Sequence, residues 1–324
     1  MRGRRTFKFE ASWIPDIEYM DIIKNAWEGE EVGGGAMMKV RRKLELCQSR
    51  QKWWSREKFG RNEDLVKEKT KLLAKLQKQE RPEHLEVIKG LQKEIDSLLE
   101  FEDTIWKQRA KQNWYRDGDR NTPFFHAWAS HRRRINTIKK VMGVEGREWS
   151  SMEDVCNTFV SYYQNLFTTK GTMGKEEFLE GLPTCVTEAM NEGLICRFDI
   201  LEVDQALAQM HPLKSSGPDG FSACFYQHSW STVHNDVCQA ILDFLNNGNF
   251  DAAINVTHIA LVPKIKNLTR IIEFRPISLC NVSYKLIAKV LANKLKKVLP
   301  EIISSKPKCV YSWAPYHKQC TYNF

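Results

Sequence analysis

The chain has 324 residues, of which 42% are hydrophobic and 27% are charged. This length and composition are sufficient for a buried core in one large or two ordinary domains, and they exclude a disordered tail, a collagen-like fibre and a membrane bundle. No apolar run is long enough to cross a bilayer and the first residues lack the apolar core of a signal peptide, so we expect a soluble protein that is not exported. The nine cysteines form no CxxC pair, which predicts neither a disulfide framework nor an ordinary zinc site.

The net charge of +9 is concentrated in two blocks. Residues 105–140 contain ten basic and two acidic residues, and residues 254–299 contain nine basic and one acidic residue, so each block carries +8 and the remainder is net acidic. Such blocks are typical of proteins that bind a polyanion, although two solvated helical faces are an alternative interpretation. Aromatic rings in the first block suit base stacking as well as a helix core. They are Trp106, Trp114, Tyr115, Phe124, Phe125 and Trp128.

The first predicted element is a strand at Phe7–Ala11, where apolar and charged residues alternate. No partner strand follows nearby, so we interpret it as the end of a domain whose body is missing. After a glycine joint at 33–35, two long helices are expected to form a hairpin around Pro82. Their apolar stripes have helical spacing and predict a packing seam. These stripes are Leu65, Leu72 and Leu76 on one helix, and Leu91, Ile95, Leu98 and Ile105 on the other.

The middle of the chain predicts a turn at 117–119, a helix from Thr122 to Arg134, a hairpin at 138–149 and a helix after Ser151. An EF-hand starting at Asp117 is excluded, because its sixth position is not glycine and its twelfth position is not glutamate.

The last third predicts helices near 201–210, 221–230, 235–246 and 284–299, with a compound turn at 214–220. Strands at 256–262 and 274–279 are expected to form a hairpin with a basic tip. The predicted fold class is α+β: a predominantly helical first part, followed by a smaller part with short β-hairpins.

Four segments resemble parts of one protein family. They are FKFEASW at 7–13, NWYRDGDRNTPFFHAWASHRRRINTI at 113–138, SSGPDGF at 215–221 and FRPISLCNVSYKLIAKVLANKL at 274–295. Together they resemble the reverse transcriptase polyprotein of plant LINE-type (non-LTR) retrotransposons, over nearly everything up to Ile303. The resemblance implies an endonuclease-domain remnant at 1–20, a helical connecting region at 21–150, a helix and linker at 151–194, an incomplete fingers subdomain at 195–303 and a frameshifted tail at 304–324.

In this family a fingers hairpin folds over the incoming nucleotide, and its basic residues hold the triphosphate. The resemblance implies this role for Arg275 and, more weakly, for Lys264; the alternative for each is a structural role, which for Arg275 would be a salt bridge. An arginine fork binds phosphate through two parallel hydrogen bonds, whereas lysine offers a mobile point charge. We expect Gly217, Pro218, Asp219 and Gly220 to shape a turn and to take no catalytic part. The expected nucleic-acid-binding residues are Arg132, Arg133, Arg134, Lys139, Lys140, Lys266, Arg270, Lys285 and Lys289.

The family polymerises with Mg²⁺ held by carboxylates of the palm, including an Asp-Asp pair. This sequence contains no Asp-Asp pair and stops before either palm segment. We therefore expect no catalytic residue, no metal site and no cofactor in this chain. The basic blocks predict RNA or DNA as an electrostatic, weakly specific partner, and the lack of a spanning segment predicts no membrane contact. The resemblance implies an intracellular location, nuclear or cytoplasmic. Without a palm, apolar surface is expected at Leu286, Ile287 and Leu291.

The residues after Ser305 read KPKCVYSWAPYHKQCTYNF and do not resemble the family. Moving the reading frame forward by one base permits a family-like continuation, so we interpret the tail as a frameshift that the genomic nucleotides would test. This interpretation argues against a zinc site formed by Cys309, His317 and Cys320, because out-of-frame residues have not been selected as ligands. Two alternatives remain for the whole chain: a nucleic-acid-binding module without enzymatic role, and an unrelated helical scaffold protein.

Overall fold

The structure is a computed structural model that describes residues 6–29, 33–79, 81–110, 127, 130–131, 134–169, 171, 185–249, 251–265 and 270–303. The helices are α1 (Tyr19–Glu28), α2 (Ala36–Phe59), α3 (Asn62–Gln77), α4 (Leu85–Ala110), α6 (Met152–Phe167), α8 (Glu188–Ile195), α9 (Ile200–Ala208), α10 (Ala223–His228), α11 (Trp230–Asn247), α12 (Val282–Lys296) and α13 (Leu299–Ile302). The strands form two antiparallel pairs, β1 (Val141–Met142) with β2 (Glu148–Trp149), and β3 (His258–Pro263) with β4 (Phe274–Leu279). Within the described residues the fold is mostly helical with two short hairpins, which confirms the α+β prediction.

The main hydrophobic core joins helices from both ends of the chain. Tyr19 and Trp27 of α1 are buried with Phe225 and Tyr226 of α10, and α2 packs along α11. Within this core, the Tyr19 hydroxyl lies 3.0 Å from the buried Ser229 hydroxyl. Packing therefore joins residues from three of the regions that the resemblance implied, 1–20, 21–150 and 195–303.

The strand predicted at Phe7–Ala11 is wrong. The Phe9 amide donates to the Gly220 carbonyl (3.0 Å), and the Gln108 side chain of α4 both donates to the Phe9 carbonyl (2.7 Å) and accepts from the Ala11 amide (2.8 Å). A turn and a side chain thus replace the neighbouring strand that a β-ladder needs. The apolar residues of this segment are used in the main core, where Phe9 is buried and Phe7 and Ala11 pack against it, whereas the charged Glu10 is buried as well.

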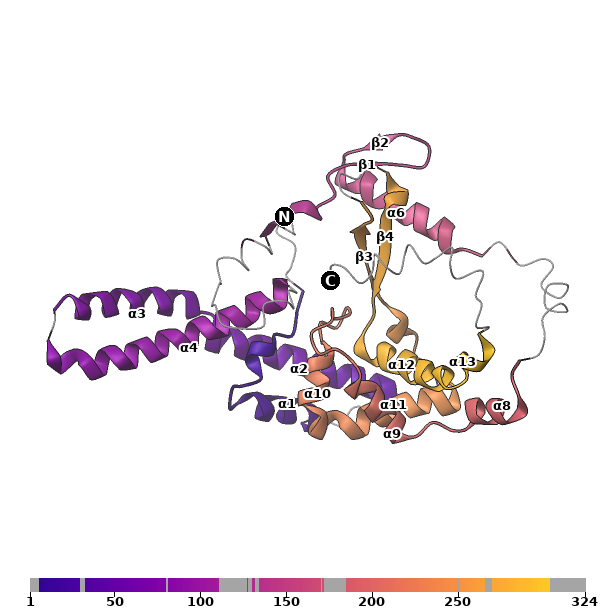
Figure 1. Cartoon of the computed structure of the whole chain (residues 1–324), viewed down its shortest axis with the longest axis horizontal. Coiled ribbons are helices and arrows are strands. Elements are labelled where there is room, and N and C mark those ends of the chain that lie inside the picture. Colours follow the sequence, from indigo (N-terminus) through magenta and orange to yellow (C-terminus); the bar gives the residue numbers. More distant parts are fainter. Residues whose placement is uncertain are drawn as a thin grey trace.

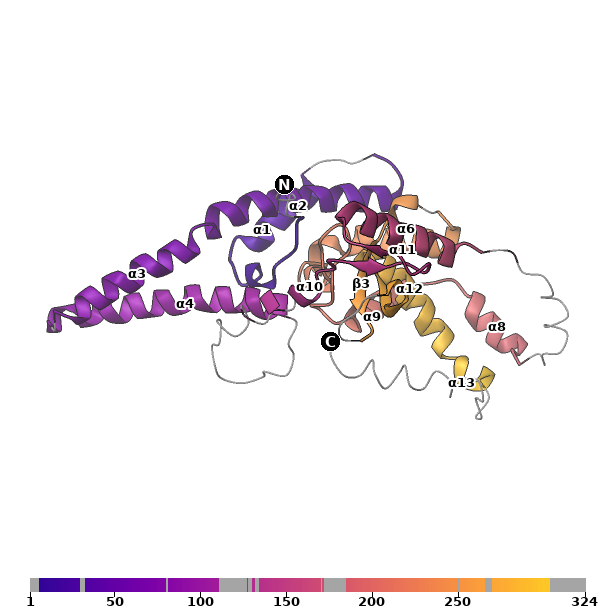
Figure 2. The ribbon, with the colours of Figure 1, turned by 90° about the horizontal axis from the view of Figure 1, so that it is seen from above.

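The long hairpin predicted around Pro82 is confirmed by α3 and α4, which project from the body as a pair (Figures 1 and 2). Near its base, the rings of Phe59 and Phe101 stack with centroids 4.3 Å apart. On the predicted seam Leu91 and Ile95 of α4 are buried, whereas Leu72 of α3 is 45% exposed, contrary to the prediction. The helix predicted from Thr122 and the turn at 117–119 lie almost entirely outside the described residues.

A second, smaller core connects the two hairpins to α6. Phe159 and Tyr163 of α6 are buried with Val141 of β1 and Phe274 of β4, and the Phe159 and Phe274 rings meet edge to face at 5.2 Å. The β3–β4 hairpin extends from the helical body up to α6 (Figure 1). Its predicted position and strand pairing are confirmed.

Helix α12 corrects the expectation that Leu286 and Ile287 are exposed. Leu286 is fully buried and Ile287 is 7% exposed, because α9 and α11 pack against α12, whereas Leu291 is 41% exposed as expected. Beyond α12, Pro300 lies inside the short helix α13. Among the described helices, none combines the length and the apolar composition that crossing a membrane requires.

Candidate nucleic-acid interface

The register of β3 and β4 places Lys264 and Arg275 on one face of the hairpin. Val262 lies opposite Arg275, and the Lys264 amide donates to the Glu273 carbonyl (2.9 Å), which continues the pairing by one residue. Opposed residues share a face and successive residues alternate, so Lys264 and Arg275 lie on the face opposite to Phe274. Phe274 is held against α6, which leaves the face with Lys264 and Arg275 directed away from that helix. The same register places Glu273 on this face, where its carboxylate accepts from the Arg270 amide (3.0 Å). We call this face the basic face.

The two basic side chains of this face differ in their contacts. The Lys264 ammonium donates one of its three N–H groups to the Ile272 carbonyl (2.7 Å). This hydrogen bond connects the two sides of the hairpin at its turn. Arg275 is half-buried, and its guanidinium has no hydrogen-bond or ion-pair partner among the described residues. The described residues therefore provide no salt bridge for Arg275.

The segment 215–221 is a tight turn that requires glycine at two positions. The Gly220 amide donates to the Gly217 carbonyl (3.1 Å), and Gly220 has a positive φ of 79°. A Cβ atom on Gly220 would lie 2.4 Å from the Phe7 carbonyl oxygen, and one on Gly217 would lie 2.5 Å from the Asn281 backbone nitrogen. The turn therefore sits in close contact with both the N-terminal segment and the start of α12.

Asp219 is held in this turn by hydrogen bonds of its carboxylate, its amide and its carbonyl. Its carboxylate accepts from the Phe221 amide (3.1 Å), its own amide donates to the Asn281 side chain (3.3 Å), and its carbonyl accepts from Gln48 of α2 (3.3 Å). Burial raises the pKa of Asp219 to about 6, although the Phe221 amide and the charge of Lys285 oppose this shift. These contacts connect the turn to α2 and α12.

Lys285 and Lys289 of α12 lie at the foot of the β3–β4 hairpin. The Lys285 ammonium donates to the Ser215 carbonyl (2.7 Å), and desolvation lowers its pKa. This hydrogen bond connects α12 to the turn at 215–221. Lys289 is half-buried one helical turn further along.

The remaining basic residues lie near the other end of the hairpin. Lys139, Lys140 and Arg270 are exposed, and Lys140 pairs with Glu148 at 2.9 Å. An isolated parallel β-bridge joins Met142 to Arg270 and so brings the end of the first basic block against the second.

Of the arginine run at 132–134, only Arg134 is described. Its guanidinium lies 3.2 Å from His131 Nδ1. Arg132, Arg133 and Lys266 lie outside the described residues.

The sequence interpretation missed Asn281 and Gln48. Asn281 precedes the first residue of α12, a position where asparagine usually caps the helix. Here its side-chain oxygen accepts from Asp219 instead, and it makes no capping hydrogen bond. An asparagine at a helix start was the available signal, whereas nothing in α2 marks Gln48.

No known protein-family profile matches the chain. The chain is similar to the "Transposon TX1 uncharacterized 149 kDa protein" of Xenopus laevis, with 30% identity over 197 residues. This match covers 60% of the chain, which spans about 15% of the length of that relative. The similarity supports, at a coarse level, a protein related to transposons.

Proposed function

We propose that this chain is a piece of a LINE-type reverse transcriptase, in which β3–β4 is the fingers hairpin and its basic face holds the triphosphate of a nucleotide. The four motif segments and the similarity to a transposon protein support the ancestry. A plant element remains the source that these motifs suggest.

The observation that carries the proposal is the shared face of Lys264 and Arg275. Two cations on adjacent strands suit a polyphosphate, because the arginine fork can make two parallel hydrogen bonds to one phosphate while the lysine neutralises a second. Arg275 has no competing partner among the described residues, and Lys264 keeps two N–H donors after its bond to Ile272.

We further propose that RNA or DNA lies along the surface where the two basic blocks meet. The Met142–Arg270 bridge supports this position. Lys139 and Lys140 precede Met142 by three and two residues, so the bridge holds their segment beside Arg270. Binding through such a surface is electrostatic and weakly specific.

The 324-residue chain by itself should bind without transferring a nucleotide. Nucleotide transfer uses two metal ions clamped by carboxylates, and this stretch of sequence contains no Asp-Asp pair. In the longer family, Mg²⁺ supplies this chemistry. A primer-extension assay with Mg²⁺ should therefore give no product, and any extension would contradict this part of the proposal.

Equilibrium binding of a deoxynucleoside triphosphate tests the proposed face. Arg275→Gln should weaken binding by at least about tenfold, and Arg275→Lys should fall between it and the wild type, because lysine keeps the charge and loses the fork. Arg50→Gln changes an exposed arginine of α2 and serves as the matched control. Equal affinity of Arg275→Gln and the wild type would overturn the nucleotide site.

A nucleic-acid-binding module without enzymatic role is the second candidate, favoured by the contact between the two basic blocks. It predicts RNA binding in the absence of any triphosphate binding. A scaffold protein predicts that neither ligand is retained even at low salt.

A further inference from the structure

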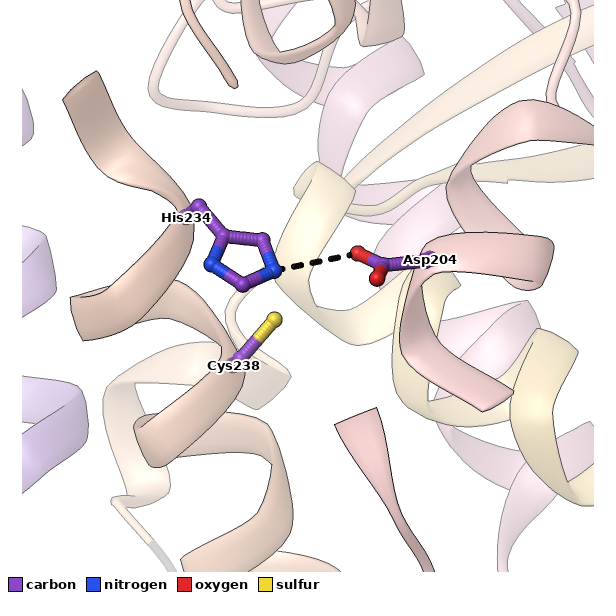
Figure 3. Close-up of side chains that lie close together, drawn as sticks. All are labelled: Asp204, His234 and Cys238. Carbon is purple, nitrogen blue, oxygen red and sulfur yellow. Dashed lines mark ion pairs between the residues drawn. The ribbon is translucent and has the colours of Figure 1, made fainter. Parts of the chain in front are cut away.

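Three side chains that can bind a metal ion meet between α9 and α11. Asp204 comes from α9, while His234 and Cys238 are one helical turn apart on α11 (Figure 3). Their ligand atoms all lie within 4.8 Å of one another, and His234 Nε2 lies 3.3 Å from Asp204 Oδ1. Residues four apart on a helix share a face, which is why both α11 side chains point at α9.

This set of donors suits zinc. Zn²⁺ binds thiolate at about 2.3 Å and imidazole or carboxylate at about 2.0–2.2 Å, usually in a tetrahedron. Those bond lengths imply separations of roughly 3.3–3.8 Å between ligand atoms. The observed spread of up to 4.8 Å would thus contract by about an ångström around an ion.

Neighbouring side chains hold two of the three donors in place. The Trp230 indole N–H donates to Asp204 Oδ1 (3.0 Å), and its ring meets the His234 ring edge to face at 5.1 Å. The Asn235 side-chain oxygen lies 3.0 Å from His234 Nδ1. When Nδ1–H donates to that oxygen, Nε2 carries the lone pair that faces Asp204 and Cys238, which is the usual orientation of a metal-binding histidine.

Two of the three groups are partly exposed, which leaves room for a solvent ligand. Cys238 is 2% exposed, whereas the side chains of His234 and Asp204 are 29% and 36% exposed. An open pocket of about 570 Å³, lined by His234, Cys238, Ile200 and Leu242 among others, reaches the two α11 donors from solvent. Three protein ligands with a fourth position open to water is an arrangement that zinc adopts in proteins.

We propose that Asp204, His234 and Cys238 bind one Zn²⁺ or a similar divalent cation, and that the ion joins α9 to α11. The site is independent of the proposed nucleotide-binding face. On binding, the Cys238 thiol gives its proton to solvent and the thiolate takes the metal. Because the folded chain then binds an ion that the unfolded chain binds less well, Zn²⁺ should raise the melting temperature.

The chain offers a matched control in Cys224 and His228 of α10. These residues repeat the types and the spacing of four, with Sγ 3.6 Å from Nδ1. No carboxylate, histidine or cysteine within the described residues completes a third ligand there. The geometry therefore assigns the metal to the α9–α11 cluster and not to the α10 pair.

The test is a competition titration of the full-length chain with Zn²⁺ and a chromophoric chelator. One equivalent should bind, and Cys238→Ser, His234→Gln and Asp204→Asn should each weaken it by at least about tenfold, the loss that even outer-shell changes cause. Cys224→Ser and the double variant Cys309→Ser/Cys320→Ser should bind as the wild type does. Wild-type affinity in Cys238→Ser, or lost binding in either control, would overturn the site.

X-ray absorption of the zinc-loaded wild type gives a readout that does not depend on whether a variant folds. The proposed site predicts one sulfur at about 2.3 Å and nitrogen or oxygen ligands at about 2.0–2.2 Å. A first shell without sulfur, or with two or more sulfurs, would place the ion elsewhere and overturn the proposal.

Discussion

The carboxyl group of Asp219 lies in the turn between α9 and α10, where burial raises its pKa from 3.8 to about 6. The folded chain therefore holds this proton more tightly than the unfolded chain does. Below about pH 4 the carboxyl is protonated in both states, and above about pH 6 it is charged in both. Between these values the folded state binds more protons, so its stability falls as pH rises. A rise in pKa from 3.8 to about 6 corresponds to about 3 kcal/mol of unfolding free energy.

Asp219→Asn should remove this pH dependence, because an amide does not ionise and its oxygen can still accept from the Phe221 amide. The difference in unfolding free energy between wild type and variant should change in favour of the variant by up to about 3 kcal/mol from pH 4 to pH 7. Chemical denaturation at both pH values measures it. A difference that is constant across this range would show that the carboxyl is not buried as described.

The turn chemistry of 217–220 could be read from the sequence, but the surroundings of Asp219 could not. Gly-Pro-Asp-Gly favours a turn wherever it occurs, because each residue restricts or permits particular backbone angles. The burial depends on Gln48, Asn281 and Phe7, which belong to distant segments. Their approach is a property of packing and leaves no local pattern.

At the scale of elements, the periodicity of apolar residues predicted the helices and hairpins whose formation depends on local sequence. The α3–α4 hairpin, α6, α9 to α12 and the β3–β4 pair follow from apolar spacing and from turn residues, and the structure has them. The Phe7–Ala11 prediction failed because alternating apolar residues can pack into a core without a neighbouring strand. The Asp204–His234–Cys238 cluster escaped the sequence interpretation because a histidine and a cysteine four apart are a weak signal until α9 brings the carboxylate.

Gly220→Ala should loosen the turn and the N-terminal segment together. The substitution adds a Cβ atom 2.4 Å from the Phe7 carbonyl in addition to placing alanine at positive φ. The left-handed conformation alone costs about 1–2 kcal/mol, and a clash with backbone should bring the total above about 3 kcal/mol. Urea denaturation measures the loss.

Gly146→Ala is the matched control for this prediction. Gly146 has nearly the same angle, φ 80°, and a Cβ atom there meets nothing within 4 Å. It should therefore cost only the conformational part, about 1–2 kcal/mol. Equal losses in the two variants would contradict the close approach of Phe7 to the turn.

At the scale of the whole molecule, the fold gathers charges that the sequence separates. The two basic blocks are more than a hundred residues apart, and the Met142–Arg270 bridge and the small core around α6 bring them together. The basic residues are evident in the sequence, and their positions on a hairpin were predicted from it. It did not predict that the blocks share a surface, since this contact depends on apolar residues from α6, β1 and β4.

The most direct test of this surface is the salt dependence of binding to single-stranded RNA. The wild-type affinity should fall steeply with salt, and the double variant Lys139→Gln/Arg270→Gln should reduce the slope of log K against log salt by roughly 1.4, since each phosphate contact contributes about 0.7. Lys75→Gln/Lys93→Gln removes the same charge from exposed positions on the α3–α4 hairpin and should keep the wild-type slope. No binding at low salt, or equal slopes in the two double variants, would contradict a nucleic-acid surface formed by both blocks.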